Sequence, residues 1–262
     1  MTLALIGDIH HGPDSAYVRG RAALPLLGEA LGRIAQRRPD LLIDLGDRIN
    51  DADVDAARAS LREVADCFGR VRAPRAHLLG NDDIVPPREQ EAILGAPLGN
   101  RSLEMQGWQL IFLDTFDGSV GGSLTLETLA WLERTLAAND LPALVFSHQP
   151  LDGQPLPGNM FFGGVYSYQA HPRGHKAARR ILERSGKVEL VVSGHAHWNH
   201  SVTVGGICHL TLAALVPFSR GADKGGFYGL LTLDSALHFE VYRCGTQERQ
   251  FQRVVKLEKN DA

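Results

Sequence analysis

Residues 4–10 have the sequence ALIGDIH, an apolar run that ends at Gly7 and is followed by Asp8 and His10. A short continuous run of Ala, Leu and Ile is typical of a strand buried on both faces, as the strands of parallel sheets are. Glycine allows the chain to turn sharply where such a strand ends. We therefore predict that Asp8 and His10 lie just beyond the carboxyl end of a buried strand.

The same arrangement recurs along the chain, with metal-binding residue types directly after further apolar runs. Such residues follow the apolar runs of four further segments. They are Asp47 in LIDLGDRIND, Asn81 in HLLGNDD, His148 in LVFSHQP, and His195 with His197 in LVVSGHAHWNH. Because the carboxyl ends of parallel strands face one crevice of an open sheet, these side chains are expected to meet there. Each motif alone is more often a turn or a polar cap, whereas the complete set indicates a binding site.

The spacing of apolar residues predicts an α/β fold. Strands are expected at residues 2–6, 41–45, 75–79, 109–113, 143–146 and 188–192, and helices at 20–37, 52–68, 124–138 and 175–184. Such alternation is typical of a sheet with parallel strands. After Gly194, closely spaced strands at 201–204, 207–213, 228–233, 238–242 and 251–257 have the pattern of half-buried antiparallel strands. We expect these later strands to form a second sheet packed on the first.

The composition is that of an ordinary globular protein, with 262 residues of which 44% are hydrophobic and 22% charged. We predict a single domain over residues 1–258, followed by a disordered tail at 259–262. Residues 151–172 combine Gly, Pro and aromatic residues without a clear period. This segment is expected either to cap the active site or to be a surface loop whose aromatic side chains pack against the body of the protein.

Charge and cysteine content exclude several classes of protein. The formal net charge of −3 provides no overall attraction for long nucleic acid or for an anionic membrane. Cys67, Cys208 and Cys244 are widely spaced and form no CxxC pair, which favours a reducing compartment over a disulfide framework or a thiolate zinc site. The first residues do not resemble a secretory leader, and no uncharged apolar run reaches membrane-spanning length. We expect a cytoplasmic protein without a membrane partner.

The residue types predict a particular chemistry. Eleven histidines accompany the motif carboxylates and the amide of Asn81. Two metal ions roughly 3.5–4 Å apart require a carboxylate to bridge them, and imidazoles with a neutral amide can fill the remaining positions without overcharging the site. Such a pair of ions lowers the pKa of a shared water, so that hydroxide is available near neutral pH.

Taken together, the five motifs closely resemble those of the calcineurin-like metallophosphoesterase family, and the resemblance extends over nearly the whole chain. It implies a four-layer α/β/β/α sandwich with two mixed central sheets and a dinuclear metal site at the carboxyl ends of the strands. It assigns one metal ion to Asp8, His10, Asp47 and His197, and the other to Asp47, Asn81, His148 and His195, with Asp47 bridging. Manganese, iron and zinc suit these ligands best. In order and spacing, the chain looks most similar to the class that includes cyclic-nucleotide and glycerophosphodiester phosphodiesterases.

One position departs from the family pattern. The third motif usually reads GNHD or GNHE, and its histidine is thought to contact the phosphate and to protonate the leaving group. Here Asp82 takes that place. An ionised carboxylate only accepts hydrogen bonds and repels phosphate, whereas a protonated one acts as an acid only if its pKa is strongly raised. Three roles stay open for Asp82: a protonated acid, a group that orients another residue, or a solvated turn residue.

Other residues near the motifs are candidates for substrate contacts. If an imidazole is still needed at the phosphate, His11 and His200 are the best placed, whereas an exposed loop and a helix start are expected for His171 and His175. Arg48 follows Asp47 and can either neutralise a phosphate oxygen or pair with a carboxylate of Asp44, Asp51 or Asp53. Trp198 is expected to line the pocket.

These observations favour hydrolysis of a small phosphodiester by in-line attack of a hydroxide that bridges the metals. The alternatives are a phosphomonoesterase with the same site and a non-catalytic scaffold that keeps the fold. A small, nucleotide-like phosphorylated substrate is the expected partner, because the aromatic residues of 151–172 can stack on a base. A homo-oligomer is compatible with the sequence.

Overall fold

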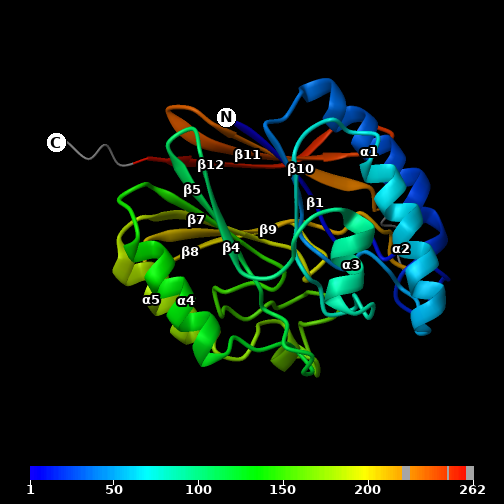
Figure 1. Ribbon diagram of the computed structural model, residues 1–262, viewed down its shortest axis with the longest axis horizontal. Helices are drawn as coiled ribbons and strands as arrows, with labels where there is room; N and C mark the ends of the chain where they lie inside the picture. Colours follow the sequence, from blue (N-terminus) through cyan, green and yellow to red (C-terminus); the bar gives the residue numbers. More distant parts are fainter. Residues whose placement is uncertain (220–224, 247, 258–262) are drawn as a thin grey trace.

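The computed structural model describes residues 1–219, 225–246 and 248–257. Two six-stranded sheets lie face to face, as Figure 1 shows. In the first sheet the strands have the order β12 (Arg249–Lys256), β11 (Ala236–Arg243), β10 (Phe227–Leu233), β1 (Thr2–Ile6), β2 (Leu41–Asp44), β3 (Arg75–His77). In the second the order is β4 (Arg101–Met105), β5 (Trp108–Leu113), β6 (Ala143–Ser147), β7 (Val188–Ser193), β9 (Ile207–Thr211), β8 (His200–Val204).

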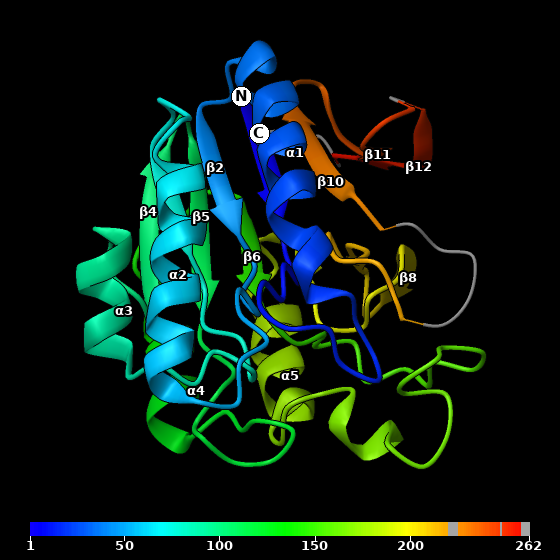
Figure 2. The ribbon, with the colours of Figure 1, turned by 90° about the vertical axis from the view of Figure 1, so that its right-hand side faces the viewer.

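Helices cover the outer face of each sheet (Figure 2), and the predicted four-layer α/β/β/α sandwich is therefore confirmed. The first sheet packs on α1 (Ala23–Arg37), which the 3₁₀ turn η1 (Gly20–Ala22) precedes, and on α2 (Val54–Phe68). The second sheet packs on α4 (Leu126–Ala137) and α5 (His175–Ser185). The short helix α3 (Pro87–Leu94) packs beside α2.

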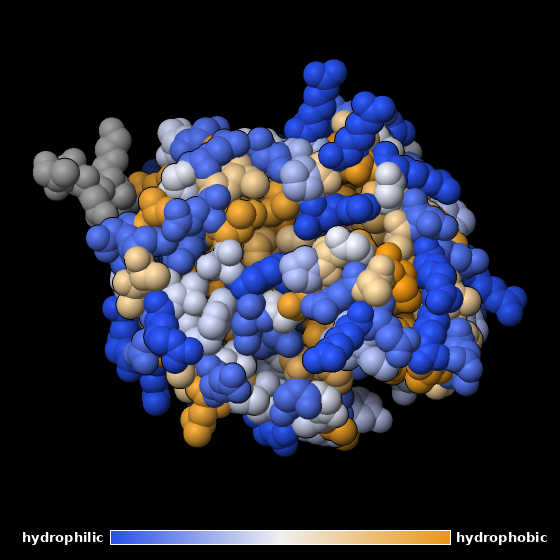
Figure 3. Space-filling view, in the orientation of Figure 1, coloured by the Kyte–Doolittle hydropathy of each residue, from blue (hydrophilic) through white to orange (hydrophobic). Residues whose placement is uncertain are grey.

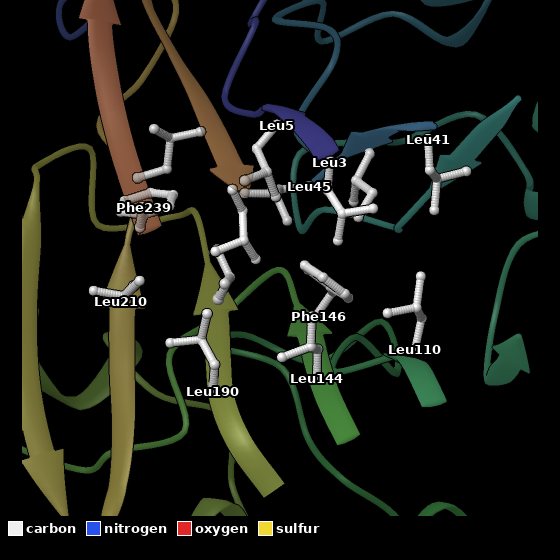
Figure 4. Close-up of a cluster of buried hydrophobic side chains, with 14 of the residues drawn as sticks. Leu3, Leu5, Leu41, Leu45, Leu110, Leu144, Phe146, Leu190, Leu210 and Phe239 are labelled. Atoms are coloured by element: carbon white, nitrogen blue, oxygen red, sulfur yellow. The ribbon is translucent and has the colours of Figure 1, made fainter. Parts of the chain in front are cut away.

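The main core lies between the two sheets and explains why the strands are continuously apolar. In β1, Leu3 and Leu5 belong to the cluster between the sheets, whereas Ala4 and Ile6 belong to the cluster under α1 and α2. Figure 4 shows side chains of the two sheets facing each other across this layer, among them Leu3, Leu41, Leu110, Phe146 and Leu190. Complete burial of a side chain of this size contributes about 1.5–3 kcal/mol.

The helix boundaries differ slightly from the predicted ones for local reasons. Helix α2 begins at Val54, two residues later than predicted, because the Asp53 side chain caps it and accepts hydrogen bonds from the backbone N–H groups of Asp55 and Ala56 at 3.0 and 2.9 Å. Helix α3 and strand β4 were not predicted. The helix has only eight residues, and the strand is a largely exposed edge strand without an apolar run.

The strands after Gly194 do not form a sheet of their own, so that prediction is wrong. Strand β9 pairs in parallel with β7, and β10 pairs antiparallel with β1. The later strands therefore extend both sheets. An alternating pattern shows which face of a strand is buried, but it does not show which neighbour offers an open edge for hydrogen bonding.

None of the helices in the described ranges is long and apolar enough to cross a membrane. On the face shown in Figure 3, hydrophilic side chains predominate over the outer helices α1 and α2. Residues 151–172 run without a helix or strand apart from the 3₁₀ turn η2 (Ser167–Gln169). The predicted tail at 259–262 and the last residue of the predicted domain lie outside the described residues.

Candidate metal centre

All the predicted metal-binding residues lie at one edge of the sandwich, just after the carboxyl ends of β1, β2, β3, β6 and β7. These strands belong to both sheets, not to one. Their ligand atoms form two clusters. The first cluster consists of Asp8, His10 and His197, and the second of Asp47, His148 and His195. The structure therefore brings together residues that are up to 189 positions apart, from Asp8 to His197.

Left-handed backbone is concentrated at this edge. Of the described residues other than glycine, seven have a positive φ, and five of these are predicted metal ligands: Asp8 (53°), His10 (45°), Asp47 (54°), His195 (66°) and His197 (53°). This conformation costs roughly 1–2 kcal/mol for an L-residue. It persists only where the surrounding structure imposes it, which is common at functional sites.

Two glycines of the motifs make room for carboxylates. A Cβ atom at Gly80 would lie 2.0 Å from Asp47 Oδ1, and one at Gly194 would lie 2.5 Å from Asp8 Oδ2. Neither glycine has a positive φ. We predicted that these glycines let the chain turn sharply at the strand ends; the structure shows that they also let the backbone approach the carboxylates closely, without a left-handed conformation.

The first cluster contains three buried side chains whose polar atoms converge. His10 Nε2 and His197 Nε2 lie 3.1 Å apart, and His197 Nε2 lies 3.3 Å from Asp8 Oδ1. The Asp47 carboxylate connects this cluster to the second, because its Oδ2 atom is 3.6 Å from His10 Nε2 and 3.3 Å from His148 Nε2. Asp47 thus has the position expected of a bridging ligand.

In the second cluster, backbone carbonyl groups orient the imidazoles. His148 Nδ1 lies 2.9 Å from the Leu45 carbonyl oxygen, and His195 Nε2 lies 3.0 Å from that of Gln169. Each of these nitrogens carries the hydrogen that it donates, which leaves the lone pair of the other ring nitrogen available as a ligand. His148 Nε2 also lies 3.1 Å from Asn81 Oδ1, so the amide presents its oxygen to the same place.

This set of donors fits two metal ions. Facing imidazole nitrogens such as those of His10 and His197 cannot both donate a hydrogen to each other, and a cation between such atoms and the carboxylates resolves the conflict. Carboxylate, imidazole and amide donors suit manganese, iron and zinc. Asp8, His10, Asp47 and His197 would hold one ion, and Asp47, Asn81, His148 and His195 would hold the other.

In the metal-free site, the pKa values of His148 and His195 shift in opposite directions. Burial disfavours the imidazolium of His148, but the charge and the hydrogen bond of Asp47 outweigh burial and raise the pKa of His148 to about 10. Burial and then the positive charge of His148 lower the pKa of His195 to about 3. Burial disfavours the Asp47 carboxylate as well, but the cationic His148 beside it lowers the pKa of Asp47.

Asp82 lies beside both clusters. Its backbone N–H donates to Asp47 Oδ1 at 2.8 Å, and its Oδ1 accepts a hydrogen bond from Asn81 Nδ2 at 2.8 Å. The Asp82 Oδ2 atom lies 3.6 Å from His10 Nδ1, and 51% of the side chain is exposed. Partial desolvation of the carboxyl group and then the charge of Asp47 raise the pKa of Asp82. The side chain is therefore ordered by its neighbours while it still faces solvent.

A cavity of about 340 Å³ opens above the metal-binding residues. Its lining includes six residues of the motifs, namely His10, Asp47, Asn81, Asp82, His195 and His197, and eight others, namely Ser15, Tyr17, Val18, Asn50, Phe161, Phe162, Tyr166 and Gln169. Four of these belong to segment 151–172, which was predicted as either a cap or a surface loop. The Phe162 ring stacks on His195 at 4.7 Å, and Phe161 lies 5.2 Å from His197.

The sequence analysis missed Tyr17 and Gln169. Tyr17 lines the cavity and contacts the ring of Phe161, with 5.9 Å between the ring centroids. Gln169 acts through its backbone carbonyl, which orients His195. Neither residue has a motif or a period that marks it, because a carbonyl group is common to every residue and a lone tyrosine in a loop is usually a surface residue.

Arg48 does not contact the cavity, and the prediction that it binds substrate is wrong. Its side chain is completely buried, with Nε 2.6 Å from Asp44 Oδ2, and it forms a second ion pair with Asp83. Its guanidinium also donates to the Leu78 carbonyl. The alternative that paired Arg48 with Asp44 is the one that the structure contains, and Asp83 is a partner that we did not predict.

Three other predicted substrate contacts do not line the cavity. His11 Nε2 pairs with Glu63 Oε2 at 2.6 Å, and His200 stacks on Trp198 with 5.0 Å between the ring centroids. None of these three predicted residues, His11, His200 and Trp198, is part of the described cavity lining. All three side chains are half-buried, and Trp198 also packs against the cluster that contains Phe162.

His171 is half-buried instead of lying in an exposed loop. Its Nδ1 and Nε2 atoms both lie 3.0 Å from backbone carbonyl oxygens, those of Pro150 and Gln154. His171 thereby ties the two ends of segment 151–172 together, and His175 lies at the first residue of α5 as predicted.

Comparisons with known proteins agree with this geometry. Residues 1–199 match the family described as calcineurin-like phosphoesterase. A Synechococcus protein named "probable cyclic nucleotide phosphodiesterase" is 31% identical over 203 residues, which cover 75% of this chain and 73% of that protein. A Moraxella catarrhalis protein with the same description is 23% identical over 215 residues, 76% of this chain and 70% of that protein.

Solved structures share the fold. A dimetal phosphatase from Danio rerio has a TM-score of 0.77 at 16% identity and covers 97% of this chain and 98% of its own. GAP50, described as the anchor in the inner membrane complex of Plasmodium, has a TM-score of 0.68 at 14% identity and covers 100% of this chain and 90% of its own. At these identities the likeness concerns the fold alone. From the match over residues 1–199, the chain belongs to the calcineurin-like phosphoesterase family of metal-dependent phosphoric ester hydrolases.

Proposed function

We propose that this protein hydrolyses a small, nucleotide-like phosphodiester at a dinuclear metal centre. The observation that carries the proposal is the complete pair of ligand clusters, which meet at Asp47 on the floor of an aromatic-walled cavity. The relatives named as probable cyclic nucleotide phosphodiesterases support the diester as substrate. Manganese, iron or zinc is the proposed metal, because the donors are oxygen and nitrogen atoms only.

When bound, the two ions would polarise phosphoryl oxygens and lower the pKa of a coordinated water. The protein's own residues hold the site in place. The carbonyl groups of Leu45 and Gln169 fix the orientation of His148 and His195, and the Asp82 backbone N–H holds one oxygen of Asp47. The side chains are therefore arranged before the substrate arrives, which lowers the cost of reorganisation during the reaction.

The cavity also has the character of a nucleotide site. A volume of about 340 Å³ lies near the lower end of the range of roughly 300–1,000 Å³ for small-molecule sites. Tyr17 and Tyr166 are 59% and 51% exposed at its rim, where their rings are available to stack on a base. Phe161, whose ring contacts that of Tyr17, can help to exclude water from the cavity.

Protonation of the leaving group has no dedicated imidazole in the described cavity lining. The histidines there are His10, His195 and His197, and all three are assigned to metal ions. We therefore propose that substrates with good leaving groups react faster than those whose leaving alkoxide needs a proton in the transition state.

Phosphomonoester hydrolysis at the same centre is the second candidate. The Danio rerio protein that shares the fold is named a phosphatase, and a dinuclear centre can clamp either kind of ester. A non-catalytic scaffold is a third candidate, because the fold is also that of GAP50, described as an anchor. The complete ligand set favours the enzyme over the scaffold.

A substrate panel tests the proposal. Protein loaded with Mn²⁺ is assayed with cyclic AMP, cyclic GMP, bis(4-nitrophenyl) phosphate and 4-nitrophenyl phosphate, in the wild type, Asp47→Asn and a matched Asp140→Asn control. Asp140 is fully exposed and pairs with Lys187, so its substitution should leave turnover unchanged. We expect diester turnover that Asp47→Asn abolishes. Two bound metals without turnover of any ester would exclude the enzymatic function.

A further inference from the structure

The permanently charged side chains in the described cavity lining are all negative, which is unusual for a site that binds a phosphate. The described lining residues include two carboxylates, Asp47 and Asp82, but no arginine or lysine. Arg48, the nearest arginine in the motifs, is completely buried and paired with Asp44 and Asp83. Within the described lining, positive charge for the substrate therefore has to come from the metal ions.

Asp82 opposes part of that positive charge. Its carboxylate belongs to a third cluster with His10 and Asp47, in which the potential ligand atoms all lie within 4.8 Å of one another. The hydrogen bond from Asn81 Nδ2 and the backbone bond to Asp47 hold it there. Because half of the side chain faces solvent, its charge acts on whatever enters the cavity.

Phosphodiesters and phosphomonoesters differ by one charge near neutral pH. A diester carries a single negative charge, whereas a monoester, with a second pKa of about 6, carries almost two. Two divalent ions bring four positive charges, and Asp8, Asp47 and a metal-bound hydroxide would offset three of them. Asp82 adds a further negative charge, whose repulsion of a ligand grows in proportion to the ligand's own charge, so that a doubly charged ligand is disfavoured more than a singly charged one.

We propose that Asp82 is a specificity-determining residue that favours singly charged phosphodiesters over doubly charged phosphomonoesters. The inference rests on the proposed function, because it concerns the choice between esters at that site. It assigns Asp82 an electrostatic role toward the substrate, by repulsion of the wrong ligand. Asp82 needs neither to bind a metal ion nor to transfer a proton for this effect.

The test compares Asp82→Asn, which removes the charge but keeps the shape, with Asp82→Glu, which keeps the charge. In Mn²⁺-loaded protein, kcat/KM is measured for bis(4-nitrophenyl) phosphate and 4-nitrophenyl phosphate. We expect the diester-to-monoester ratio to fall about tenfold in Asp82→Asn, which corresponds to about 1.4 kcal/mol. In Asp82→Glu the ratio should stay near that of the wild type. Metal content and melting temperature are checked for each variant.

A binding measurement provides a readout that does not depend on turnover. Inorganic phosphate and dimethyl phosphate are titrated into the same metal-loaded proteins by calorimetry. We expect Asp82→Asn to bind inorganic phosphate about tenfold more tightly, with a smaller change for dimethyl phosphate, since the latter carries one charge.

Several outcomes would overturn the proposal. An unchanged ester ratio together with unchanged phosphate affinity in Asp82→Asn would show that its charge does not select the substrate. Loss of a metal ion from Asp82→Asn with equal loss for both esters would make Asp82 a metal ligand instead. If the wild type hydrolyses neither ester, the proposed function fails, and the phosphate titration alone then decides: tighter binding by Asp82→Asn supports the role of Asp82, and equal binding refutes it.

Discussion

Replacement of Arg48 by methionine is expected to destabilise the whole protein without any direct effect on substrate binding. Arg48 is among the largest completely buried side chains, and its guanidinium bonds Asp44 Oδ2 at 2.6 Å, Asp83 and the Leu78 carbonyl. Methionine replaces the aliphatic part of the side chain but has no guanidinium group and no charge. Arg48→Met therefore leaves two buried carboxylates without their cation.

The expected magnitude follows from this environment. Breaking a buried pair by removal of one partner costs about 3–5 kcal/mol, because the remaining charge stays buried. Asp44 keeps a hydrogen bond to His77 Nδ1 at 2.8 Å, and Asp83 keeps those from the backbone N–H groups of Gly80 and Arg48 at 3.0 and 2.9 Å. Because these remaining hydrogen bonds partly stabilise both carboxylates, the loss of stability should stay within about 3–5 kcal/mol. At roughly 2–4 °C per kcal/mol, the melting temperature should fall by about 10 °C.

The assay is thermal and urea unfolding of the metal-free protein, followed by circular dichroism. Arg58→Met is the matched control, since Arg58 also pairs with two carboxylates, Asp55 and Glu89, but at the surface. Exposed ion pairs contribute little, so the control should unfold close to the wild type. Phosphate binding by the refolded, metal-loaded Arg48→Met protein is measured alongside.

A melting temperature of Arg48→Met equal to that of the Arg58→Met control would refute this reasoning. So would a variant of normal stability that binds inorganic phosphate many times more weakly. The second result would return Arg48 to the substrate-binding role that its position after Asp47 had indicated.

Three further predictions concern the site. In the metal-free protein Asp47 raises the pKa of His148 to about 10, so that His148 is protonated at pH 8. Metal binds the neutral imidazole, and binding should therefore release about one proton, measured by calorimetry in buffers of different ionisation enthalpy. No proton release in the wild type would contradict the ion pair between Asp47 and His148. Phe161→Ala should raise KM for cyclic AMP more than for 4-nitrophenyl phosphate, and an equal effect on both would remove the aromatic wall from substrate recognition. His171→Leu should speed hydrogen exchange in residues 151–172 but not in β1, because the ring nitrogens of His171 lie 3.0 Å from the carbonyl oxygens of Pro150 and Gln154, at and just before the start of that segment; unchanged exchange would show that other contacts hold it.

Much of the metal centre could be predicted from the sequence because its residues depend on local features. An apolar run identifies a buried strand, and the polar residue after it must lie at the strand's end whichever sheet it joins. Asp8, Asp47 and His195 are all found in this way. The prediction of the metal ligands was therefore correct in position although the strands were assigned to the wrong sheets.

Features that depend on distant partners were missed. Arg48 and Asp83 are 35 positions apart, and nothing in the segment around Arg48 shows that Asp83 turns inward beneath it. The pairing of β9 with β7 and of β10 with β1 likewise depends on open strand edges, which no residue pattern reveals. The contribution of Gln169 comes from its backbone. Such features follow from the assembled fold and not from the residue type.

The central claim is that two metal ions, held by two ligand clusters that Asp47 connects, hydrolyse a phosphodiester. The most direct measurement is the initial rate of bis(4-nitrophenyl) phosphate hydrolysis as metal-free protein is titrated with Mn²⁺. The dinuclear site predicts that the rate rises to a plateau at two equivalents per chain. A plateau at one equivalent, or two bound equivalents with no hydrolysis at all, would contradict the claim.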